Sequence, residues 1–366
     1  MNKLNINLDS IGLVCTSIDN MAGGLERQII RTCQSFLDQG FQVFLFTFDN
    51  ENATPFYKLP EKIIWVRCGQ GLNPHSSAPI YLRLGQIHYM RKVIIKNSIK
   101  KIITFHHGLF PRTLLACLFL PIKLLISERN SLTFYKYIKL SKYNIGFLSL
   151  FFADAITVQL PAYKSQYPLI LQKRIFVINN FIKKPLKKYK EPNLESNKVA
   201  MLGRLCAQKN YEPILDHLSF HSQSNIELMI AGDGDFSDFI KNKYKKIIKK
   251  KKVSLLGNIK NIDKFLASAS IYCLTSQWEG YPNSLAEALR MCLPIVISKR
   301  FIELKEFVEH EINGLIVNDN EYIDAIVYLL ENKNLLAKMS KESYKKYFNL
   351  CMSKPSLDWY DLIENK

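Results

Sequence analysis

The sequence has no two cysteines in C-x-x-C spacing and no cysteine with a histidine close by. Its eight cysteines are scattered along the chain instead. This distribution argues against a zinc site and against a disulfide framework, because both need ligands or partners at short, regular spacings. We therefore expect the cysteines to be reduced core residues of a cytosolic protein.

Long uninterrupted apolar runs are also missing. Residues 109–126 and 145–160 approach the length of a membrane span, but prolines or charged side chains interrupt both. The first residues, up to Cys15, resemble a short lipoprotein signal, yet Asp9 interrupts them and their apolar part is too short. We predict no transmembrane helix and interpret the N-terminal segment as the first strand.

Acidic residues are scarce in the first half of the chain. The net charge of the whole chain is +18. Residues 1–200 contain 27 Lys/Arg and 11 Asp/Glu, whereas residues 201–366 contain 23 and 21. A basic surface interleaved with aromatic and leucine residues is attracted to anionic lipid headgroups, so we predict a peripheral contact with an anionic membrane surface. A solvated lysine-rich surface is the alternative. No nucleic-acid-binding module is recognisable, which argues against nucleic acid as a partner.

Apolar, strand-like runs alternate with helical patterns in both halves of the chain. This alternation predicts an α/β fold with two doubly wound parallel sheets. Residues 183–197 are polar, charged and proline-containing, which is typical of a linker. They would separate a first domain, residues 1–182, from a second, residues 198–350. Strands of the first domain are expected at residues 12–16, 42–47, 63–66, 101–105, 123–127, 155–158 and 175–178.

The most informative segment is residues 274–297, in which Glu279 and Glu287 are eight positions apart. An apolar strand is followed by a glycine-containing loop and then by an Ala/Leu-rich helix that begins near Ser284. Unpaired backbone N–H groups and the helix dipole make such a helix start an anion site. Carboxylates beside it would accept hydrogen bonds from hydroxyls. A phosphate flanked by sugar hydroxyls describes a nucleotide sugar; the alternative is two ordinary surface glutamates of an unrelated α/β protein.

The segment resembles the Glu-x7-Glu motif of the retaining glycosyltransferases of family four, which have the two-domain GT-B fold. Six further matches follow in order along most of the chain. They are GGLER at 23–27, SERN at 127–130, ADAITVQ at 153–159, GRLCAQKN at 203–210, IAGDGD at 230–235 and NGLIV at 313–317.

The resemblance implies a division of labour between two Rossmann-like domains that face one another across a cleft. The second domain would hold the nucleotide sugar and the first the acceptor, while residues 351–366 would form a helix that returns to the first domain. Domain closure is expected, with hinges near residues 183–197 and before Ser356.

In the donor site, Arg204 and Lys209 match the residues that grip the diphosphate in this family. Physically, they would neutralise the charge that develops on the leaving group. Glu287 would accept hydrogen bonds from the ribose and Glu279 would contact the donor sugar. Gly232, Asp233, Asn258 and Ile259 would lie near the base, although ordinary strand-end turns explain them equally well. The remaining expected donor contacts are Gly23, Gly24, Gly203, Gly280, Tyr281, Pro282, Asn283, Ser284 and Leu285.

Asp233 and Asp235 also form the Asp-x-Asp pattern of metal-dependent glycosyltransferases with a single-domain fold. Because Arg204, Lys209 and a helix start already supply positive charge, we predict that no metal and no other cofactor is needed.

Polar residues at strand ends in the first domain form a second group of candidates. Gly23 and Gly24 precede a helix, which would let the backbone approach a diphosphate or an acceptor. His106 and His107 end one strand, and the resemblance favours His107 as a catalytic contact to the sugar. Glu128, Arg129 and Asn130 end the next strand and are assigned to the acceptor or the donor sugar.

No enzyme nucleophile stands out, which fits the front-face retaining reaction that the resemblance implies. We expect a hexose or N-acetylhexosamine, from a UDP-sugar, to be transferred to a lipid-linked glycan for a bacterial surface polysaccharide, at the cytoplasmic face of the inner membrane. Two competing interpretations are a nucleotide-sugar epimerase of the same architecture and a non-catalytic sugar-nucleotide-binding subunit.

Overall fold

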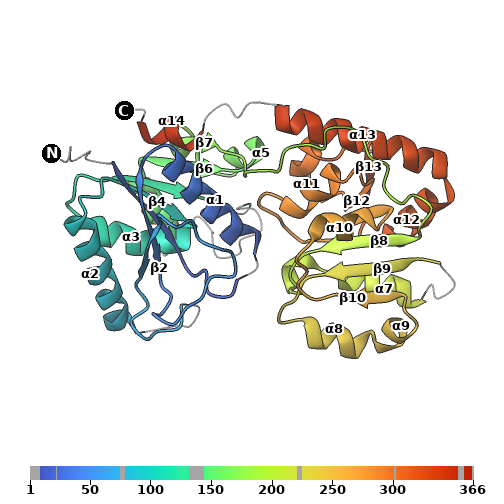
Figure 1. Cartoon of the computed structure of the whole chain (residues 1–366), viewed down its shortest axis with the longest axis horizontal. Coiled ribbons are helices and arrows are strands. Elements are labelled where there is room, and N and C mark those ends of the chain that lie inside the picture. The colour runs from blue at the N-terminus through green and yellow to red at the C-terminus, as the bar shows by residue number, and fades with distance from the viewer. Residues whose placement is uncertain are drawn as a thin grey trace. The chain divides into compact units, whose positions relative to one another are not determined.

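The computed structural model describes residues 9–21, 23–74, 79–129, 131, 144–220, 225–300, 302–352 and 358–364. The chain divides into two compact units (Figure 1). Unit 1 comprises Met1–Phe181 and Pro355–Lys366, and unit 2 comprises Ile182–Lys354. Within the described residues, no helix is both long enough and apolar enough to span a membrane. All eight cysteines are free of disulfides, and six of them are buried.

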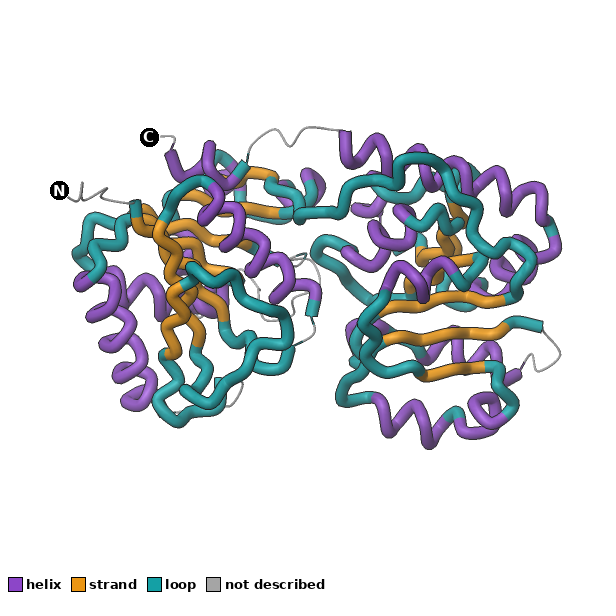
Figure 2. The backbone as a smooth tube through the Cα atoms, in the orientation of Figure 1, coloured by secondary structure: helices purple, strands orange, loops and turns teal. Residues whose placement is uncertain are grey.

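Unit 1 is built on a parallel sheet, and strands are drawn in orange in Figure 2. This sheet has seven strands in the order β3-β2-β1-β4-β5-β6-β7. The predicted bounds of four strands are confirmed without change, and those of the other three shift by one or two residues. The strands are β1 (Ser10–Cys15), β2 (Gln42–Thr47), β3 (Ile64–Arg67), β4 (Lys101–Phe105), β5 (Lys123–Ser127), β6 (Ala155–Val158) and β7 (Ile175–Val177). The central strands are buried along almost their whole length, as expected for a parallel sheet with helices on both faces.

The helices of unit 1 follow the strands in alternation. They are α1 (Gly24–Asp38), α2 (Ile80–Lys96), η1 (His107–Leu109), α3 (Phe110–Cys117), α4 (Ile145–Ser149), η3 (Leu150–Phe152), α5 (Pro161–Lys164), α6 (Leu169–Gln172) and α14 (Trp359–Glu364). The helix α14 comes from the far end of the chain, and its Trp359, Leu362 and Ile363 belong to the apolar core between α1 and the sheet. The Trp359 ring lies 6.5 Å from the ring of Phe105 at the end of β4.

Unit 2 contains a six-stranded parallel sheet with the order β10-β9-β8-β11-β12-β13. Its strands are β8 (Lys198–Leu202), β9 (Glu227–Ala231), β10 (Val253–Leu255), β11 (Ile271–Leu274), β12 (Ile295–Ser298) and β13 (Gly314–Val317). Its helices are η4 (Ala207–Lys209), α7 (Glu212–Phe220), α8 (Ser237–Lys243), α9 (Lys245–Lys249), α10 (Ile262–Ala267), α11 (Asn283–Arg290), η5 (Ile302–Glu306), α12 (Tyr322–Glu331) and α13 (Lys333–Met352). The helix α13 ends two residues beyond the limit of 350 expected for this domain.

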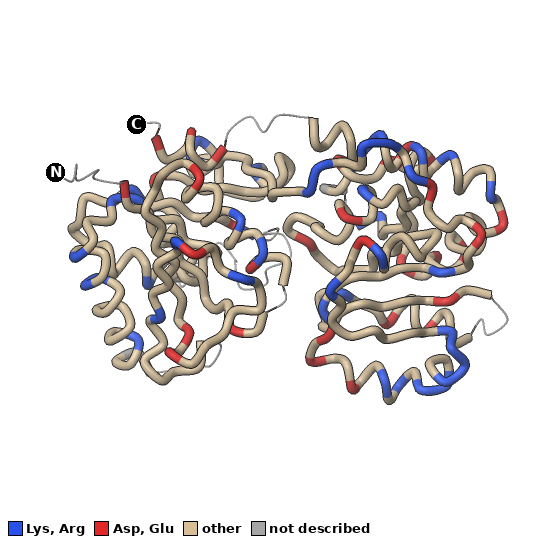
Figure 3. The backbone as a smooth tube through the Cα atoms, in the orientation of Figure 1, with Lys and Arg blue, Asp and Glu red and all other residues tan. Residues whose placement is uncertain are grey.

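Charge is distributed unevenly over the helices of both units. The helix α2 carries four Lys/Arg and no Asp/Glu (Figure 3). A second basic cluster lies on α8 and α9, where Lys241 and Lys243 form ion pairs with nearby carboxylates. The two clusters therefore differ in how much of their charge is compensated locally.

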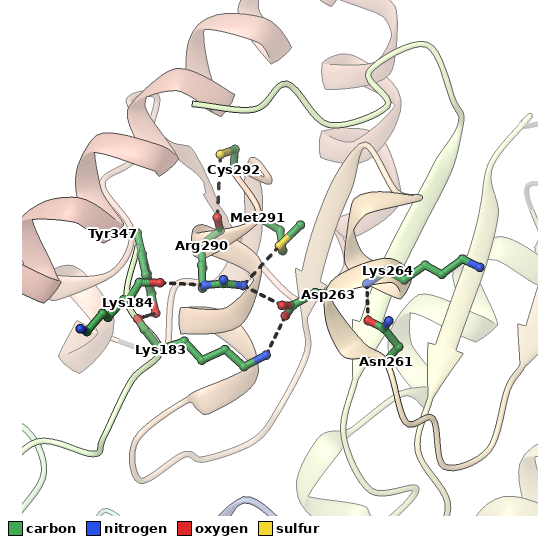
Figure 4. A network of polar contacts seen from close by, with 9 residues as sticks. All are labelled: Lys183, Lys184, Asn261, Asp263, Lys264, Arg290, Met291, Cys292 and Tyr347. Carbon is green, nitrogen blue, oxygen red and sulfur yellow. Dashed lines mark hydrogen bonds and ion pairs between the residues drawn. The ribbon is translucent and has the colours of Figure 1, made fainter. Parts of the chain in front are cut away.

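The first residues of the segment expected to be a linker, residues 183–197, are hydrogen-bonded to other residues of unit 2 (Figure 4). The carbonyl of Lys183 accepts a hydrogen bond from the hydroxyl of Tyr347 at 2.6 Å. The carbonyl of Lys184 accepts one from Nε of Arg290 at 3.0 Å. The side chains of Lys183 and Arg290 both pair with Asp263, at 2.9 and 2.8 Å. These polar groups anchor the start of the segment to α10, α11 and α13.

On the other side of the boundary, Phe181 is anchored within unit 1. The side chain of Gln28, on α1, bonds both the N–H and the carbonyl of Phe181 at 2.9 Å. Ile182 therefore lies between two hydrogen-bonded stretches, one in each unit. The hinges expected near residues 183–197 and before Ser356 stay predictions.

Candidate functional site

The strand order of unit 2 reverses between β8 and β11, and the loops after these strands carry most of the expected donor-site residues. Ligands of open α/β sheets bind at the carboxyl ends of the strands beside such a reversal. The loop after β8 runs from Gly203 to Lys209, and the loop after β11 runs from Thr275 to Pro282 and leads into α11.

Lys209 and Glu279 meet between these two loops. The Lys209 Nζ atom lies 2.6 Å from Oε1 of Glu279, which is only 7% exposed. The same Oε1 accepts a hydrogen bond from the Ser276 hydroxyl at 2.6 Å. The Thr275 hydroxyl donates to the Lys209 carbonyl at 2.8 Å, which ties the two loops together. An ammonium has three N–H donors, so one can hold Glu279 while the others bind a phosphate.

Arg204 lies in the same loop, on the surface. Its side chain is exposed, and it makes none of the ion pairs found among the described residues. Gly203, just before it, packs against the aliphatic part of the Lys209 side chain, where an added Cβ would lie 2.6 Å from Cε. The structure thus brings Lys209 and Glu279 together and leaves Arg204 at the rim of the loop.

The helix α11 begins directly after the loop that carries Glu279. Pro282 precedes it, Asn283, Ser284 and Leu285 form its first turn, and Glu287 is half-buried one turn further on. The N–H of Asn283 donates to the carbonyl of Tyr281 at 2.8 Å, so this amide is already engaged. The side chain of Leu285 is fully buried, which leaves its backbone as the part that could face a ligand.

The side chain of Tyr281, one of the expected donor contacts, is buried in unit 2. Its ring is 6% exposed and packs edge-on against Phe307, with the ring centroids 5.1 Å apart. Burial raises the pKa of its hydroxyl well above the ordinary value. The large apolar ring contributes to the core, and Gly280 beside it is buried as well.

The glycines after β8 and β9 allow the strand-end loops to pack closely. A Cβ on Gly232 would overlap the carbonyl oxygen of Gly203, and the φ of Gly232 is +135°. The N–H of Gly232 donates to the Gly257 carbonyl at 2.8 Å. Asp233 accepts a bond from the N–H of Gly234 at 2.9 Å and so closes its own turn. Close packing therefore explains why a glycine stands at position 232. At the same edge of the sheet, Asn258 is exposed and Ile259 is half-buried.

No group of three or more His, Cys, Asp or Glu residues arranged to hold a metal occurs in the described part of the chain. Asp233 and Asp235 are both exposed.

In unit 1, His107 and Glu128 form a buried pair at the ends of β4 and β5. The His107 Nδ1 atom lies 2.9 Å from Oε2 and 3.1 Å from Oε1 of Glu128. Burial alone would raise the pKa of Glu128, but the adjacent His107 outweighs it and holds that pKa below its ordinary value. His107 is 2% exposed, so the histidine expected to touch the sugar is the more buried of the two.

His106 differs from its neighbour in backbone and exposure. Its φ is +86°, its Nδ1 accepts the N–H of Gly108 at 3.0 Å, and its ring lies 4.1 Å from that of His107. Burial lowers the pKa of His106. A positive φ in a non-glycine residue is costly and is found preferentially at functional positions.

Arg129 joins a polar network at the ends of β5, β6 and β7. Its Nη1 donates to Oδ1 of Asn180 at 2.8 Å, and Nε2 of Gln159 donates to the same oxygen at 2.9 Å. The guanidinium lies 4.8 Å from the centre of the Phe105 ring. Burial lowers the pKa of Arg129 to about 9, which leaves it charged at neutral pH. Asn130 lies outside the described residues.

Several residues of these sites were missed by the sequence analysis. Ser276, Gln159 and Asn180 each follow a strand and could have been found as polar residues at strand ends. At Gly23, an added Cβ would overlap Oε2 of the buried Glu26, so a carboxylate of the chain itself lies beside the start of α1. The approach of a diphosphate or an acceptor to Gly23 and Gly24 stays a prediction.

Comparison with known proteins identifies the class to which this architecture belongs. A mutant of Staphylococcus aureus TarM, solved with fondaparinux, α-GlcNAc-glycerol and UDP, aligns with a TM-score of 0.77 at 14% identity, over 98% of this chain and 100% of TarM. Sucrose-phosphate synthase from Thermosynechococcus elongatus aligns with a TM-score of 0.74 at 17% identity, over 93% and 94% of the two chains. The chain has the GT-B fold of glycosyltransferases.

Sequence comparison indicates the family. Residues 183–346 match the family model of Glycosyl transferases group 1, so this region belongs to that family. A Campylobacter jejuni protein is 23% identical over 93% of this chain and 95% of its own length. It is named as an α-1,4-N-acetyl-D-galactosaminyltransferase of GalNAc-α-(1→4)-GalNAc-α-(1→3)-diNAcBac-PP-undecaprenol. The expected family and fold are thereby confirmed, and the chain is a glycosyltransferase.

Proposed function

We propose that the enzyme is a retaining, metal-independent glycosyltransferase that moves a hexose or N-acetylhexosamine from a UDP-sugar to a lipid-linked glycan of a bacterial surface polysaccharide. The observation that carries the proposal is the Lys209–Glu279 pair at the carboxyl edge of the unit 2 sheet, directly before α11. A cation and a carboxylate thus lie beside a helix start, an arrangement that would suit a diphosphate with an attached sugar.

In this proposal, Lys209 and Arg204 bind the diphosphate from one side and the first turn of α11 binds it from the other. Preorganised donors of this kind lower the barrier because they stabilise charge that grows on the leaving phosphate. Glu279 holds the Lys209 ammonium in place and contacts the donor sugar, and Glu287 accepts bonds from the ribose. These cationic groups supply the charge stabilisation for which other glycosyltransferases use a divalent metal.

The acceptor side is assigned to unit 1. Glu128 fixes the orientation of the His107 ring, and Arg129 supplies a positive charge at the neighbouring strand end. In the front-face reaction that we propose, the departing phosphate oxygen takes the proton of the acceptor hydroxyl, so the protein needs no nucleophile of its own. Its contribution is positioning and charge stabilisation.

A lipid-linked acceptor is supported by the undecaprenol-linked substrate in the name of the Campylobacter jejuni relative. UDP as the donor nucleotide is supported by the UDP bound in the TarM structure. With a lipid-linked acceptor, the enzyme would work as a peripheral protein at the cytoplasmic face of the inner membrane.

The proposal is tested by incubating the protein with a panel of UDP- and GDP-sugars in EDTA and following thermal stabilisation and slow release of free sugar. One UDP-sugar should stabilise the fold and be hydrolysed, and NMR of the first-formed sugar should show a retained anomeric configuration. Inversion, or activity that requires manganese, would contradict the mechanism. Conversion of the sugar nucleotide to an epimer would indicate the epimerase instead.

A further inference from the structure

A surface of unit 1 combines exposed apolar side chains with uncompensated positive charge. It extends over α2, α3, α4 and η3, which contact one another in that order along the surface. Nη1 of Arg91, on α2, donates to the carbonyls of Ala116 and Leu118 at 3.0 and 2.8 Å, which fixes the end of α3 against α2. The most exposed apolar members are Tyr81, Leu84, Ile95, Phe119, Ile145 and Phe152. We call this surface the apolar-basic face.

The helix α2 shows most clearly that the exposed apolar residues are organised. Tyr81, Leu84 and Ile95 recur at helical spacing on its outer face and are 70%, 55% and 54% exposed. Met90 and Ile94 on the inner face are buried in the core. The outer row extends over about 21 Å of helix, at 1.5 Å per residue. Single exposed apolar residues are ordinary, but an aligned row with neighbours on three adjacent elements indicates an interaction surface.

The charge around this row has one sign. Residues 79–129 contain nine Lys/Arg and one Asp/Glu. Lys101 pairs with Asp9 and Glu364, and Arg129 bonds Asn180, so neither contributes to this face. The single acidic residue, Glu128, is buried against His107 and does not reach the surface. Lys92 and Lys96 are exposed on α2 between and beside the apolar residues. This charge is complementary to an acidic partner surface.

We infer that the apolar-basic face docks on an anionic bilayer, with its aromatic and aliphatic side chains in the interfacial layer and its lysines and arginines on lipid phosphates. Interfacial elements have this composition, with basic residues flanking aromatic and leucine side chains. A second copy of the chain is a poor occupant, because a twofold contact would bring two positively charged faces together. The inference rests on the proposed function for the lipid-linked acceptor and goes beyond it by naming the surface that reaches the membrane.

The apolar part is tested with the full chain and two matched triple variants that leave charge unchanged. One carries Tyr81→Ser, Leu84→Ser and Ile95→Ser; the control carries Phe239→Ser, Tyr328→Ser and Met352→Ser, exposed apolar residues on helices of unit 2. Flotation uses phosphatidylcholine vesicles with and without one-third phosphatidylglycerol. Loss of buried apolar area should weaken binding of the first variant to anionic vesicles by about tenfold or more, with little change in the control. Equal losses in the two variants would overturn the inference.

The basic part is tested with Lys92→Glu and Lys96→Glu against Lys246→Glu and Lys249→Glu on α9, all exposed. The α2 reversal should reduce binding to anionic vesicles by about tenfold or more and the α9 reversal by much less, since only α2 would lie at the bilayer. Wild-type binding to phosphatidylcholine alone that equals binding to anionic vesicles would contradict the role of charge. A stronger loss from the α9 reversal would place the membrane contact on unit 2.

Two further measurements, of the oligomeric state and of UDP-sugar hydrolysis, distinguish membrane docking from self-association and from failure of the proposed function. Light scattering after gel filtration should show a monomer for wild type and variants; a dimer that dissociates on Tyr81→Ser, Leu84→Ser and Ile95→Ser would assign the face to a second copy and overturn the inference. UDP-sugar hydrolysis should be unchanged in all these variants. Vesicle binding without any transfer or hydrolysis would refute the proposed function and leave the membrane face standing.

Discussion

The Lys209 ammonium and the Glu279 carboxylate lie 2.6 Å apart, although 70 positions separate them in the chain. They meet because β8 and β11 are neighbours in the unit 2 sheet, where the strand order reverses. The pair fixes the position of a cation that the proposed mechanism needs at the diphosphate.

Replacement of Lys209 should therefore impair catalysis more than folding. Lys209→Ala removes a preorganised donor to the leaving phosphate and should lower kcat for sugar release by about a hundredfold or more, or about 3 kcal/mol. The measurement is UDP-sugar hydrolysis at saturating donor. The matched control is Lys338→Ala, an exposed lysine on α13, which should keep its activity. Intact turnover in Lys209→Ala would remove the basis of the diphosphate assignment.

Stability in acid should depend on the buried Glu128. Because contact with His107 lowers the pKa of Glu128 in the folded protein, its stabilising contribution is complete above the ordinary pKa of 4.5 and is lost as the pH falls through the lowered value. The free energy of unfolding, measured with urea, should fall more steeply below about pH 4.5 for wild type than for Glu128→Gln. At neutral pH the same substitution should cost about 1–3 kcal/mol, because it weakens a buried hydrogen bond.

The exposed Glu195 provides the comparison for this measurement. Glu195→Gln should follow the wild-type pH dependence. If Glu128→Gln also followed the wild-type pH dependence, the contact between Glu128 and His107 would not contribute to the stability of the fold.

The anchoring of residues 183–184 should depend on Asp263. Asp263→Asn weakens its pairs with Lys183 and Arg290, so the boundary segment should exchange amide hydrogens faster (Figure 4). Hydrogen exchange of peptides covering residues 183–190 measures the effect, with the exposed Asp324→Asn on α12 as control. Unchanged protection would show that the Tyr347 and Arg290 hydrogen bonds to the backbone are sufficient on their own.

Close loop packing should make Gly232 intolerant of a side chain. Gly232→Ala strains the backbone and forces apart the loops after β8 and β9, so it should cost about 3 kcal/mol or more in unfolding free energy. Gly40 has a φ of +89° but nothing within 4 Å of an added Cβ. Gly40→Ala should therefore cost only the strain, about 1–2 kcal/mol. Equal costs at the two positions would argue against the close contact between Gly203 and Gly232.

Strand positions could be predicted from sequence because each apolar run ends at a polar or glycine residue. The bounds of β2, β4, β5 and β6 needed no change. The strand β1 begins earlier than expected, since Ser10 and Ile11 pair with Gln42 and Val43 of β2. Such pairing depends on the neighbouring strand, which local composition does not encode.

Contacts between residues that are distant in the chain could be predicted from the sequence only in part. The resemblance grouped Lys209 with Glu279, but spacing alone could not show an ion pair across 70 positions. The burial of Tyr281 against Phe307 and the return of Glu26 over Gly23 depend on side-chain directions that periodicity does not give. Likewise, polar composition predicted a linker at residues 183–197 but could not show its hydrogen bonds to Arg290 and Tyr347, which lie more than a hundred positions away.

The most direct test of the account is calorimetric titration of UDP into wild type and the Arg204→Ala, Lys209→Ala double variant, with EDTA present throughout. The account predicts that wild type binds UDP without metal and that the double variant binds it about a hundredfold more weakly, since two charge-assisted contacts to the diphosphate are lost. Equal affinities, or wild-type binding that appears only when manganese is added, would contradict it.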